Sequence, residues 1–420
     1  MTQSPTVSLR LRYWYRYGAM VGFVERARRF VVETIRRFPW VGWSGWLVFC
    51  AIALARTNPR RFASTFNYYL EAADRLLAHQ PVYDPHTLGA FLYLPVSLLL
   101  LAPLTAIDPV AAAALSMLVY AVVFSWGAYT VVARLLPKGV DTVSAAQIAG
   151  VVLLVNVPAA WFNFKGVQSQ IIMTGAMMAA AAAMMNARWL LASLWLFIGI
   201  AFKPLALVMA LLCIVLVPRM RLPLILAIAA IFALPFLFFD NAYVVEQYRG
   251  LVEKMWEIAA SRVEDWPYRA DLFTLLAALG IEVPSPAAIA IRLVFSLGTL
   301  YLAWRVRQAG GPRSFAFALM ILSAAYVNLL SPRNEFLSFI LLTLPLAVLA
   351  LLLLARDEAD WRGWLLIAAA LVLGMWWNLT FDAIVKPAIV LVLDAWLIYL
   401  MIEPDRWRAL IENPPDPALR

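Results

Sequence analysis

The sequence predicts an all-α protein that crosses a membrane many times. Its mean hydropathy is +0.80 and only 14% of its 420 residues are charged, whereas soluble domains carry about 25%. The apolar residues form about twelve runs that approach or exceed the roughly 20 residues a helix needs to cross a bilayer. Clear examples are residues 41–55, 91–107, 110–136 and 222–239.

One long membrane domain is expected, with a short polar segment at each end. Residues 41–402 hold the apolar runs, without an internal repeat or a soluble domain. Residues 1–40 carry eight arginines and two glutamates, and the positive-inside rule keeps such a segment in the cytoplasm. Its apolar residues recur at helical spacing, which predicts an amphipathic helix on the inner leaflet, with a solvated basic tail as the alternative. The net charge of +9 therefore indicates orientation and lipid contact, and no motif for binding nucleic acid is present.

Arginine-bearing turns predict the orientation of the membrane domain. Counting crossings from a cytoplasmic N-terminus places four basic stretches inside: residues 218–221, 305–313, 356–362 and the tail 403–420. The same count places two longer loops outside, residues 56–90 and 240–270, together with the short turn at 331–335. We therefore expect a multi-pass protein of a bacterial inner membrane, with both termini in the cytoplasm.

Two stretches fit this orientation less well. The count leaves Arg134 and Lys138 outside, against the positive-inside rule. It also places residues 163–170 inside, although the glycine and glutamines of this stretch could form a re-entrant turn that lines a cavity.

The first outer loop is unusually polar for this chain. Within residues 66–79 the apolar positions follow the i, i+3, i+4 spacing of an amphipathic helix, which leaves Glu71 and Asp74 on the polar arc. This helix could present its carboxylates to a polar cavity, or it could be an interfacial helix with a solvated face. Prolines at 81 and 85 then fix a turn around Tyr83 and Asp84.

No metal site is predicted. His79 and His86 are separated by prolines that interrupt any helix joining them. Cys50 and Cys213 lie inside apolar runs and are expected to be small core residues.

Several motifs, taken in order, resemble those of glycosyltransferase family 87. The first loop contributes "YYLEAADRLL", "VYDP" and "FLYLP". Downstream come "GVQSQIIMTG", the Lys-Pro helix "AFKPLALV", "DNAYVVEQY" and "SPRNEF", so that the resemblance covers about residues 62–350. Family 87 enzymes are polyprenyl-phosphate-dependent, have the GT-C fold and include bacterial mannosyltransferases.

The resemblance implies a transferase that moves a mannose-like hexose from a polyprenyl-phosphate donor to a lipid or glycan acceptor at the outer face. No cofactor beyond the donor lipid is implied. One position departs from the family pattern. In the mannosyltransferases an aspartate thought to act as catalytic base precedes the first-loop tyrosine by four residues, and counting back from Tyr69 gives Thr65.

Such a reaction needs a base for the acceptor hydroxyl and positive charge for the departing phosphate. Asp84 and Glu71 are the first candidates for the base. Lys203 is the first candidate for the phosphate, because a lysine in the middle of an apolar run should face the protein interior or a wet cavity. Arg333, just before a predicted helix, is the second, although it could simply pair with Glu335.

The remaining predicted substrate-binding residues are Tyr83, Asp74, Gln168, Tyr248, Arg249 and Glu335. Carboxylates of the second outer loop, including Asp271, are further candidates for the base. Two other functions stay open. A transporter or lipid flippase would also need a buried Lys203, but it should show repeated halves. An inactive relative that binds polyprenyl phosphate would tolerate Thr65.

Overall fold

The computed structural model describes residues 33–34, 37–56, 64–83, 92–136, 144–260, 269–332, 334–354 and 360–412. Within these ranges the protein consists of α-helices and short 3-10 segments, and its only β-type pairing is an isolated bridge between Arg269 and Glu335. The predicted all-α class is confirmed. The amphipathic helix predicted within residues 1–40 lies almost wholly outside the described residues.

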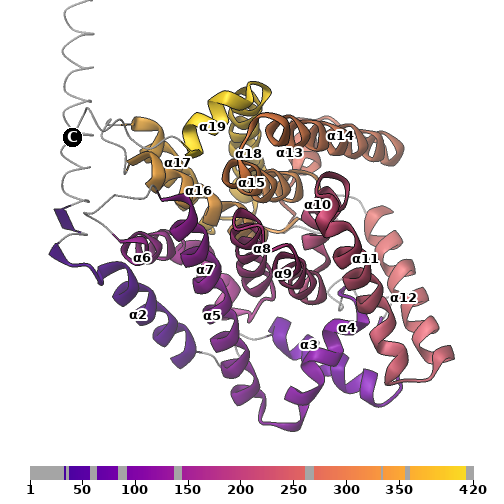
Figure 1. Cartoon of the computed structure of the whole chain (residues 1–420). Coiled ribbons are helices and arrows are strands. Elements are labelled where there is room, and N and C mark those ends of the chain that lie inside the picture. Colours follow the sequence, from indigo (N-terminus) through magenta and orange to yellow (C-terminus); the bar gives the residue numbers. More distant parts are fainter. Residues whose placement is uncertain are drawn as a thin grey trace, which may run out of the picture.

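The helices follow one another with short connections (Figure 1). The first half of the chain forms α2 (Val41–Ala55), α3 (Ser64–Leu77), α4 (Pro95–Leu101), η1 (Ala102–Ala106), α5 (Pro109–Leu135), α6 (Ala145–Val155), α7 (Val157–Lys165), α8 (Gln170–Met185), α9 (Trp189–Phe202), η2 (Pro204–Ala206) and α10 (Leu207–Leu216). The second half forms α11 (Pro218–Ala233), η3 (Leu234–Leu237), α12 (Asn241–Ala260), α13 (Leu272–Ala278), α14 (Ser285–Ala309), α15 (Pro312–Leu330), η5 (Phe336–Phe339), α16 (Ile340–Leu354), α17 (Trp361–Gly374), α18 (Leu379–Ile402) and α19 (Pro404–Glu412).

Many of these helices are apolar enough to lie in a membrane. Six in the described residues are also long enough to cross it: α5, α11 with η3, α14, α15, η5 with α16, and α18. A seventh crossing results if α6 and α7, bent by 63° at their junction, count as one span. Six shorter apolar helices, including α2, α8 and α9, accompany them. The chain is therefore a polytopic membrane protein.

The run at residues 91–107 is not the crossing that its hydropathy predicts. It folds as two short elements, α4 and η1, of seven and five residues. Both elements pack against α3, and Figure 1 shows α3 and α4 together beside the start of α5. Pro103 and the Asp108 cap of α5 end this segment, since the Asp108 side chain accepts hydrogen bonds from the first amides of α5.

The centre of the bundle is formed by α8, α15 and α16. Every residue of α8 and α16 is buried. Close approach of α5 and α8 depends on two glycines: a Cβ on Gly127 would lie 2.2 Å from the carbonyl oxygen of Gly175, and a Cβ on Gly175 would lie 2.6 Å from the Cα of Phe124. Small residues at such crossings allow helix backbones to touch in membranes.

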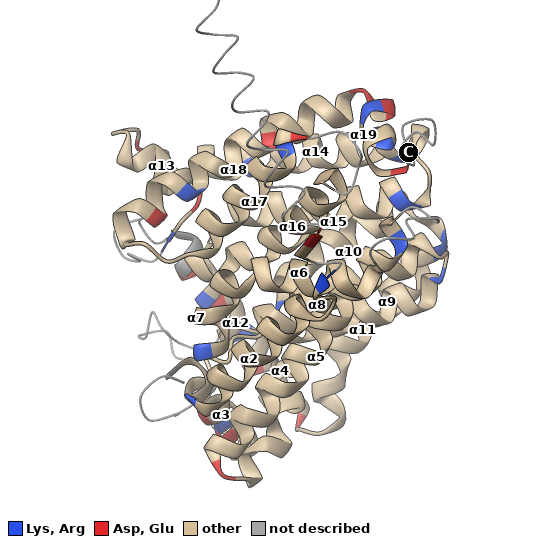
Figure 2. Cartoon of the chain, turned by 90° about the vertical axis from the view of Figure 1, so that its left-hand side faces the viewer, with Lys and Arg blue, Asp and Glu red and all other residues tan. Residues whose placement is uncertain are grey.

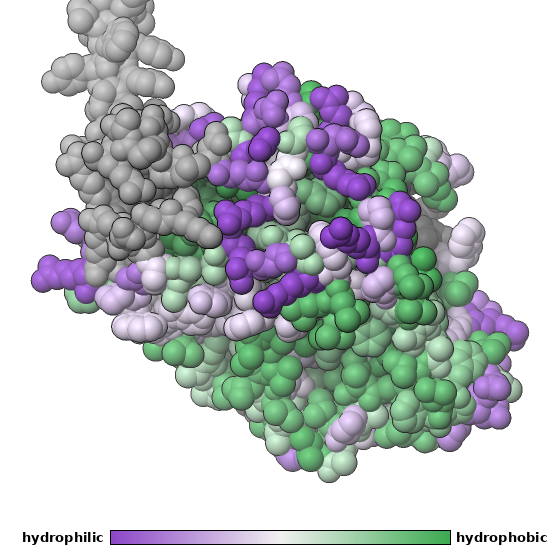
Figure 3. All heavy atoms as spheres, in the orientation of Figure 1, coloured by the Kyte–Doolittle hydropathy of each residue, from purple (hydrophilic) through white to green (hydrophobic). Residues whose placement is uncertain are grey.

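Charged residues gather toward two parts of the molecule. Figure 2 shows mostly uncharged helical ribbon, with Lys, Arg, Asp and Glu concentrated around α3, the end of α7 and α13 on one side, and around α19 on the other. Figure 3 shows a broad hydrophobic surface across the lower half of the view, where α5 and α11 run. We call the side that holds α3, the end of α7 and α13 the site end.

Candidate functional site

The amphipathic helix predicted in the first outer loop is α3. Tyr69, Ala72, Ala73 and Leu76 are buried as the spacing predicts, whereas Leu77 is exposed. Glu71 and Asp74 lie on the opposite, exposed arc. Glu71 forms an ion pair with Arg75 one turn later, with 2.6 Å between carboxylate and guanidinium, and its side chain is 55% exposed. The two carboxylates therefore point away from the buried face of α3.

Gln168 bridges two residues on the inner face of α3. Its side chain is buried, and its Oε1 accepts a hydrogen bond from Tyr69 Oη at 3.1 Å. Its Nε2 donates to Thr65 Oγ1 at 3.1 Å. The turn between α7 and α8 that presents Gln168 passes through Val167 at φ 48°, a left-handed conformation that β-branched residues rarely adopt. Such strain at a polar turn is characteristic of functional sites.

Two more tyrosines extend this network. The Tyr69 and Tyr93 hydroxyls are 2.8 Å apart, and Tyr83 Oη donates to the Tyr93 carbonyl oxygen at 2.7 Å. Burial, and then the neighbouring Tyr93, raise the pKa of Tyr69 well above its ordinary value. Its hydroxyl is therefore protonated at neutral pH, so it acts as a hydrogen-bond donor rather than as a base.

Lys203 occupies a complete break in the helical run, where the sequence suggests only a kink. Its backbone is extended, with φ −154° and ψ 120°, and it separates α9 from η2 and α10. The chain turns back here, which brings residues on the two sides of the break together: a Cβ on Gly199 would lie 3.2 Å from the Cβ of Ala206. Pro204 has no N–H to donate to the carbonyl of Ile200 and so cannot continue α9. Past the break the carbonyl of Ala201 has no helical donor either, and it accepts a hydrogen bond from Ser97 Oγ.

This break places the Lys203 ammonium beside Tyr93. Lys203 Nζ lies 5.4 Å from the centroid of the Tyr93 ring, within the range of a cation–π contact. The side chain is partly buried, and among the described residues no carboxylate forms an ion pair with it. We call Thr65, Tyr69, Tyr93, Gln168 and Lys203 the Lys203 cluster. It combines a cation with several hydroxyl groups, a combination suited to binding a phosphate and a sugar.

The residues of this cluster come from separated parts of the chain. A family model described as glycosyltransferase family 87 matches residues 91–332. The matched range holds 242 of the 420 residues, which is more than half of the chain. The chain belongs to glycosyltransferase family 87. The family resemblance predicted from the sequence motifs is confirmed, and a membrane glycosyltransferase is the activity that membership supports.

Other comparisons add little detail for this family 87 protein. Among solved structures, the apo form of the Archaeoglobus fulgidus oligosaccharyltransferase matches 90% of this chain with 13% sequence identity and a TM-score of 0.41. The match covers 57% of that enzyme, so the chain spans little more than half of its length. The comparison with curated proteins finds no match.

The other predicted site residues are dispersed or lie outside the described ranges. Asp84 and Arg333 lie outside them. In α12, Arg249 is exposed, and Tyr248 donates from its hydroxyl to the Phe232 carbonyl at 3.0 Å, against the end of α11. Glu335 is partly buried and pairs through its backbone with Arg269. The structure thus brings Gln168 and Lys203 together with α3, but it places Glu71, Asp74 and Arg249 on exposed surfaces.

The two outer loops contact one another. The backbone amide of Val82 donates to Gln247 Oε1 at 2.9 Å, and Tyr243 Oη donates to the Gln80 carbonyl at 2.8 Å. Both partners are on α12. The first loop is therefore held against the second on the same side of the molecule as the Lys203 cluster.

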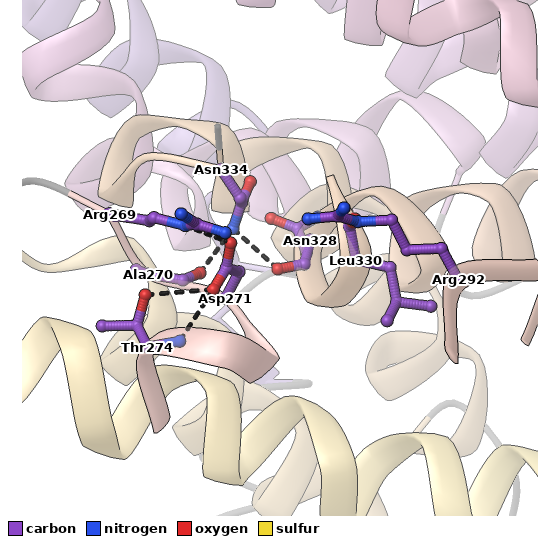
Figure 4. A network of polar contacts seen from close by, with 8 residues as sticks. All are labelled: Arg269, Ala270, Asp271, Thr274, Arg292, Asn328, Leu330 and Asn334. Atoms are coloured by element: carbon purple, nitrogen blue, oxygen red, sulfur yellow. Dashed lines mark hydrogen bonds and ion pairs between the residues drawn. The ribbon is translucent and has the colours of Figure 1, made fainter. Parts of the chain in front are cut away.

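A second polar cluster closes the far end of the second loop (Figure 4). Arg269 Nε donates to the fully buried carboxylate of Asp271 at 2.6 Å, and Asp271 also caps α13 through Thr274. Asn334 donates to the Ala270 carbonyl at 2.7 Å, which joins this segment to the turn before η5. Asp271, a sequence candidate for the base, is therefore committed to an ion pair and a helix cap.

Sequence reasoning missed Tyr69 and Tyr93 as members of the site. Aromatic residues near a membrane surface are common interfacial residues, so their identity alone says little. A usable signal was available for Tyr69, because it lies four residues after Thr65 and one turn of helix brings both onto one face. Among the described residues, no three His, Cys, Asp or Glu side chains are grouped so as to hold a metal ion.

Proposed function

We propose that this protein transfers a hexose, mannose-like, from a polyprenyl-phosphate donor to a lipid or glycan acceptor at the outer face of a bacterial inner membrane. The observation that carries the proposal is the Lys203 cluster, in a chain that belongs to a glycosyltransferase family. A cation without a carboxylate partner among the described residues is placed beside hydroxyl donors, at a break between apolar helices.

Lys203 would bind the donor phosphate. In a single displacement the acceptor oxygen forms a bond to the anomeric carbon, while the bond from that carbon to the phosphate oxygen breaks. The leaving polyprenyl phosphate gains negative charge, and a fixed ammonium stabilises that charge most where water is excluded. Tyr69 and Tyr93, as hydrogen-bond donors, would orient the sugar or the phosphate. This route inverts the configuration at the sugar carbon.

A base must take the proton of the acceptor hydroxyl, and we assign this role to Asp84. Glu71 was predicted beside it, but the Glu71 carboxylate is exposed and already paired with Arg75. Asp84 follows Tyr83 directly, and Tyr83 is tied to Tyr93 through its hydroxyl. Asp84 directly follows this anchor in the sequence, which supports the assignment.

The outer location is supported by a revised count of crossings. If α4 and η1 stay beside α3, α5 returns to the cytoplasm, so that Arg134 lies inside and the turn carrying Gln168 lies outside. The break at Lys203 adds one crossing in compensation, because α9 and α10 then run in opposite directions. All later arginine-bearing turns keep the cytoplasmic position that the positive-inside rule favours.

The test is an assay of transfer with purified protein and radiolabelled polyprenyl-phosphate mannose, glucose or arabinose in native membranes. We expect Lys203→Met to lower turnover by about a hundredfold or more, since removal of one charge-stabilising group costs roughly that much. Lys203→Arg should retain part of the activity. Asp84→Asn should be as impaired as Lys203→Met, and Glu71→Gln should resemble the wild type. Full activity of Lys203→Met would refute the proposed phosphate site.

Thr65 supports one alternative, a protein that binds polyprenyl phosphate without transferring the sugar. Threonine cannot act as a base at neutral pH, and here its hydroxyl is already an acceptor for Gln168. Under this alternative the wild type binds the donor lipid, Lys203→Met binds it less tightly, and no sugar is transferred to any acceptor.

A further inference from the structure

Arg292 is the one charged residue in the first 20 residues of α14, and it lies about 10 Å along the helix from Ser285. The neighbouring residues Ile289 and Leu293 are exposed and apolar, and α14 as a whole is among the least buried of the long helices. Arg292 thus lies beside an exposed apolar surface of α14, near the site end.

Two contacts hold the guanidinium of Arg292 in place. Its Nε donates to the carbonyl oxygen of Leu330, the last residue of α15, at 3.0 Å. Its central carbon lies 4.6 Å from the centroid of the Phe273 ring on α13. These contacts use Nε and one face of the group. The two terminal nitrogens make no hydrogen bond or ion pair within the part of the chain that the structure describes.

The positive charge of Arg292 also has no ion-pair partner among the described residues. Figure 4 shows Arg269 and Arg292 on opposite sides of the cluster that contains Asp271 and Asn334. The Asp271 carboxylate is bonded to Arg269 and to the start of α13, and no described carboxylate pairs with Arg292. A partly buried charge beside lipid is costly unless an anion accompanies it.

We propose that Arg292 binds the phosphate of a membrane lipid at the corner formed by α13, α14 and the end of α15. Both terminal nitrogens of a guanidinium point in one direction and match two phosphate oxygens. The lipid's apolar chains would lie along the exposed face of α14. This site is separate from the Lys203 cluster and does not depend on the proposed transfer reaction.

A purely structural role offers the competing explanation, because an arginine can cap the C-terminal carbonyl of a helix. The chain contains a matched control for that role. Arg305, also on α14, donates to the carbonyl of Ile402, the last residue of α18, at 2.9 Å. Arg305→Gln removes a comparable helix cap without touching the proposed lipid site.

Lipid binding to the full-length purified protein tests the proposal, by native mass spectrometry in detergent. Four probes are titrated: phosphatidylglycerol, polyprenyl phosphate, and their phosphate-free counterparts diacylglycerol and polyprenol. We expect Arg292→Gln to weaken binding of at least one phosphate lipid about tenfold or more, with phosphate-free lipids unaffected and Arg305→Gln unchanged. Loss confined to one phosphate lipid identifies the source of the phosphate. Measuring the same series on the Lys203→Met background keeps this site distinct from the transferase site.

Unchanged binding of both phosphate lipids to Arg292→Gln overturns the proposal, as does an equal loss in Arg305→Gln or an equal loss of the phosphate-free lipids. If Arg292→Gln does not fold, wild-type protein is photocrosslinked with diazirine-bearing phosphatidylglycerol and polyprenyl phosphate. Crosslinks within residues 272–296 support the site, and crosslinks found only elsewhere refute it.

Discussion

Gln168 determines which way the first-loop helix presents its chemistry. One side chain holds Tyr69 and Thr65, one turn apart, through hydrogen bonds of 3.1 Å each. Thr65 therefore faces the Lys203 cluster and not the outer surface of α3. It is also the position at which family resemblance implies an aspartate.

Under the alternative in which the protein binds the donor without transferring its sugar, replacing Thr65 by aspartate should create transferase activity. The new carboxylate would accept the hydrogen bond from Gln168 Nε2 that Thr65 Oγ1 now accepts, so it would stand on the same face as Tyr69. A positioned general base contributes about 10²-fold or more to such a reaction. We expect at least a tenfold rise in turnover in the radiolabelled donor assay.

The control for this change is Thr65→Asn, which has nearly the same shape as aspartate and can occupy the same place, but cannot take a proton at neutral pH. Equal turnover in Thr65→Asp and Thr65→Asn would show that this position does not supply the base.

At this scale the sequence predicts polar residues in apolar surroundings better than it predicts aromatic ones. Lys203 was found because a charged group within an apolar run should face the interior or a wet cavity, and Gln168 because its turn could line a cavity and resembles a family motif. Glu71 was chosen because helical spacing separates a polar arc from an apolar arc, but spacing alone does not say whether the polar arc faces a cavity or water. In α3 the polar arc faces outward, and the site uses the mixed inner face instead.

Among the elements, close helix packing rests on particular glycines. The α5–α8 contact leaves no room for a side chain at Gly127, because an added Cβ would approach the Gly175 carbonyl oxygen to 2.2 Å. The contacting atoms are backbone, so no side chain can rotate to relieve the overlap. Every residue of α8 is buried, so this helix has no exposed surface. It begins directly after the turn that presents Gln168 and supports that turn.

We expect Gly127→Ala to lower stability by about 1–3 kcal/mol or more, the usual range for overpacking a well-packed core. Thermal unfolding of the purified protein, followed by aggregation or tryptophan fluorescence, measures the change. Gly298→Ala is the matched control, since a Cβ at Gly298 on α14 would meet no atom within 4 Å. Equal melting temperatures for the two variants would show that the α5–α8 contact is looser than described.

Helix boundaries followed hydropathy where the runs are uninterrupted. The runs at 41–55 and 110–136 correspond to α2 and α5 almost residue for residue. Prediction failed where a proline or a tertiary contact divides an apolar run. The run at 91–107 is short because it packs against α3, and the Lys203 run is two helices because Pro204 removes a donor and Ser97 satisfies the carbonyl of Ala201.

For the whole molecule, the two differences from the expected helices, at residues 91–107 and at Lys203, compensate one another in the count of crossings. In the revised count, removing a crossing at residues 91–107 reverses the orientation of α5 to α9, and adding one at Lys203 restores it from α10 onward. The arginine-bearing turns of the second half therefore fit both counts. Only Arg134 and Lys138, in the segment between them, conflicted with the positive-inside rule.

The revised orientation predicts that Ser144 faces the cytoplasm and Ala78 the outside. Both residues are exposed, Ser144 as the cap of α6 and Ala78 just after α3. Single cysteines are introduced there after Cys50 and Cys213 are replaced by alanine, and intact cells are treated with a membrane-impermeant maleimide. Ala78→Cys should be labelled in intact cells, whereas Ser144→Cys should be labelled only after the cells are opened.

Labelling of both from outside would restore residues 91–107 as a crossing. It would also place the turn that carries Gln168 on the opposite side of the membrane from the loop to which its side chain is hydrogen-bonded. Because one short side chain cannot contact partners across a bilayer about 30 Å thick, that result would contradict the Lys203 cluster itself.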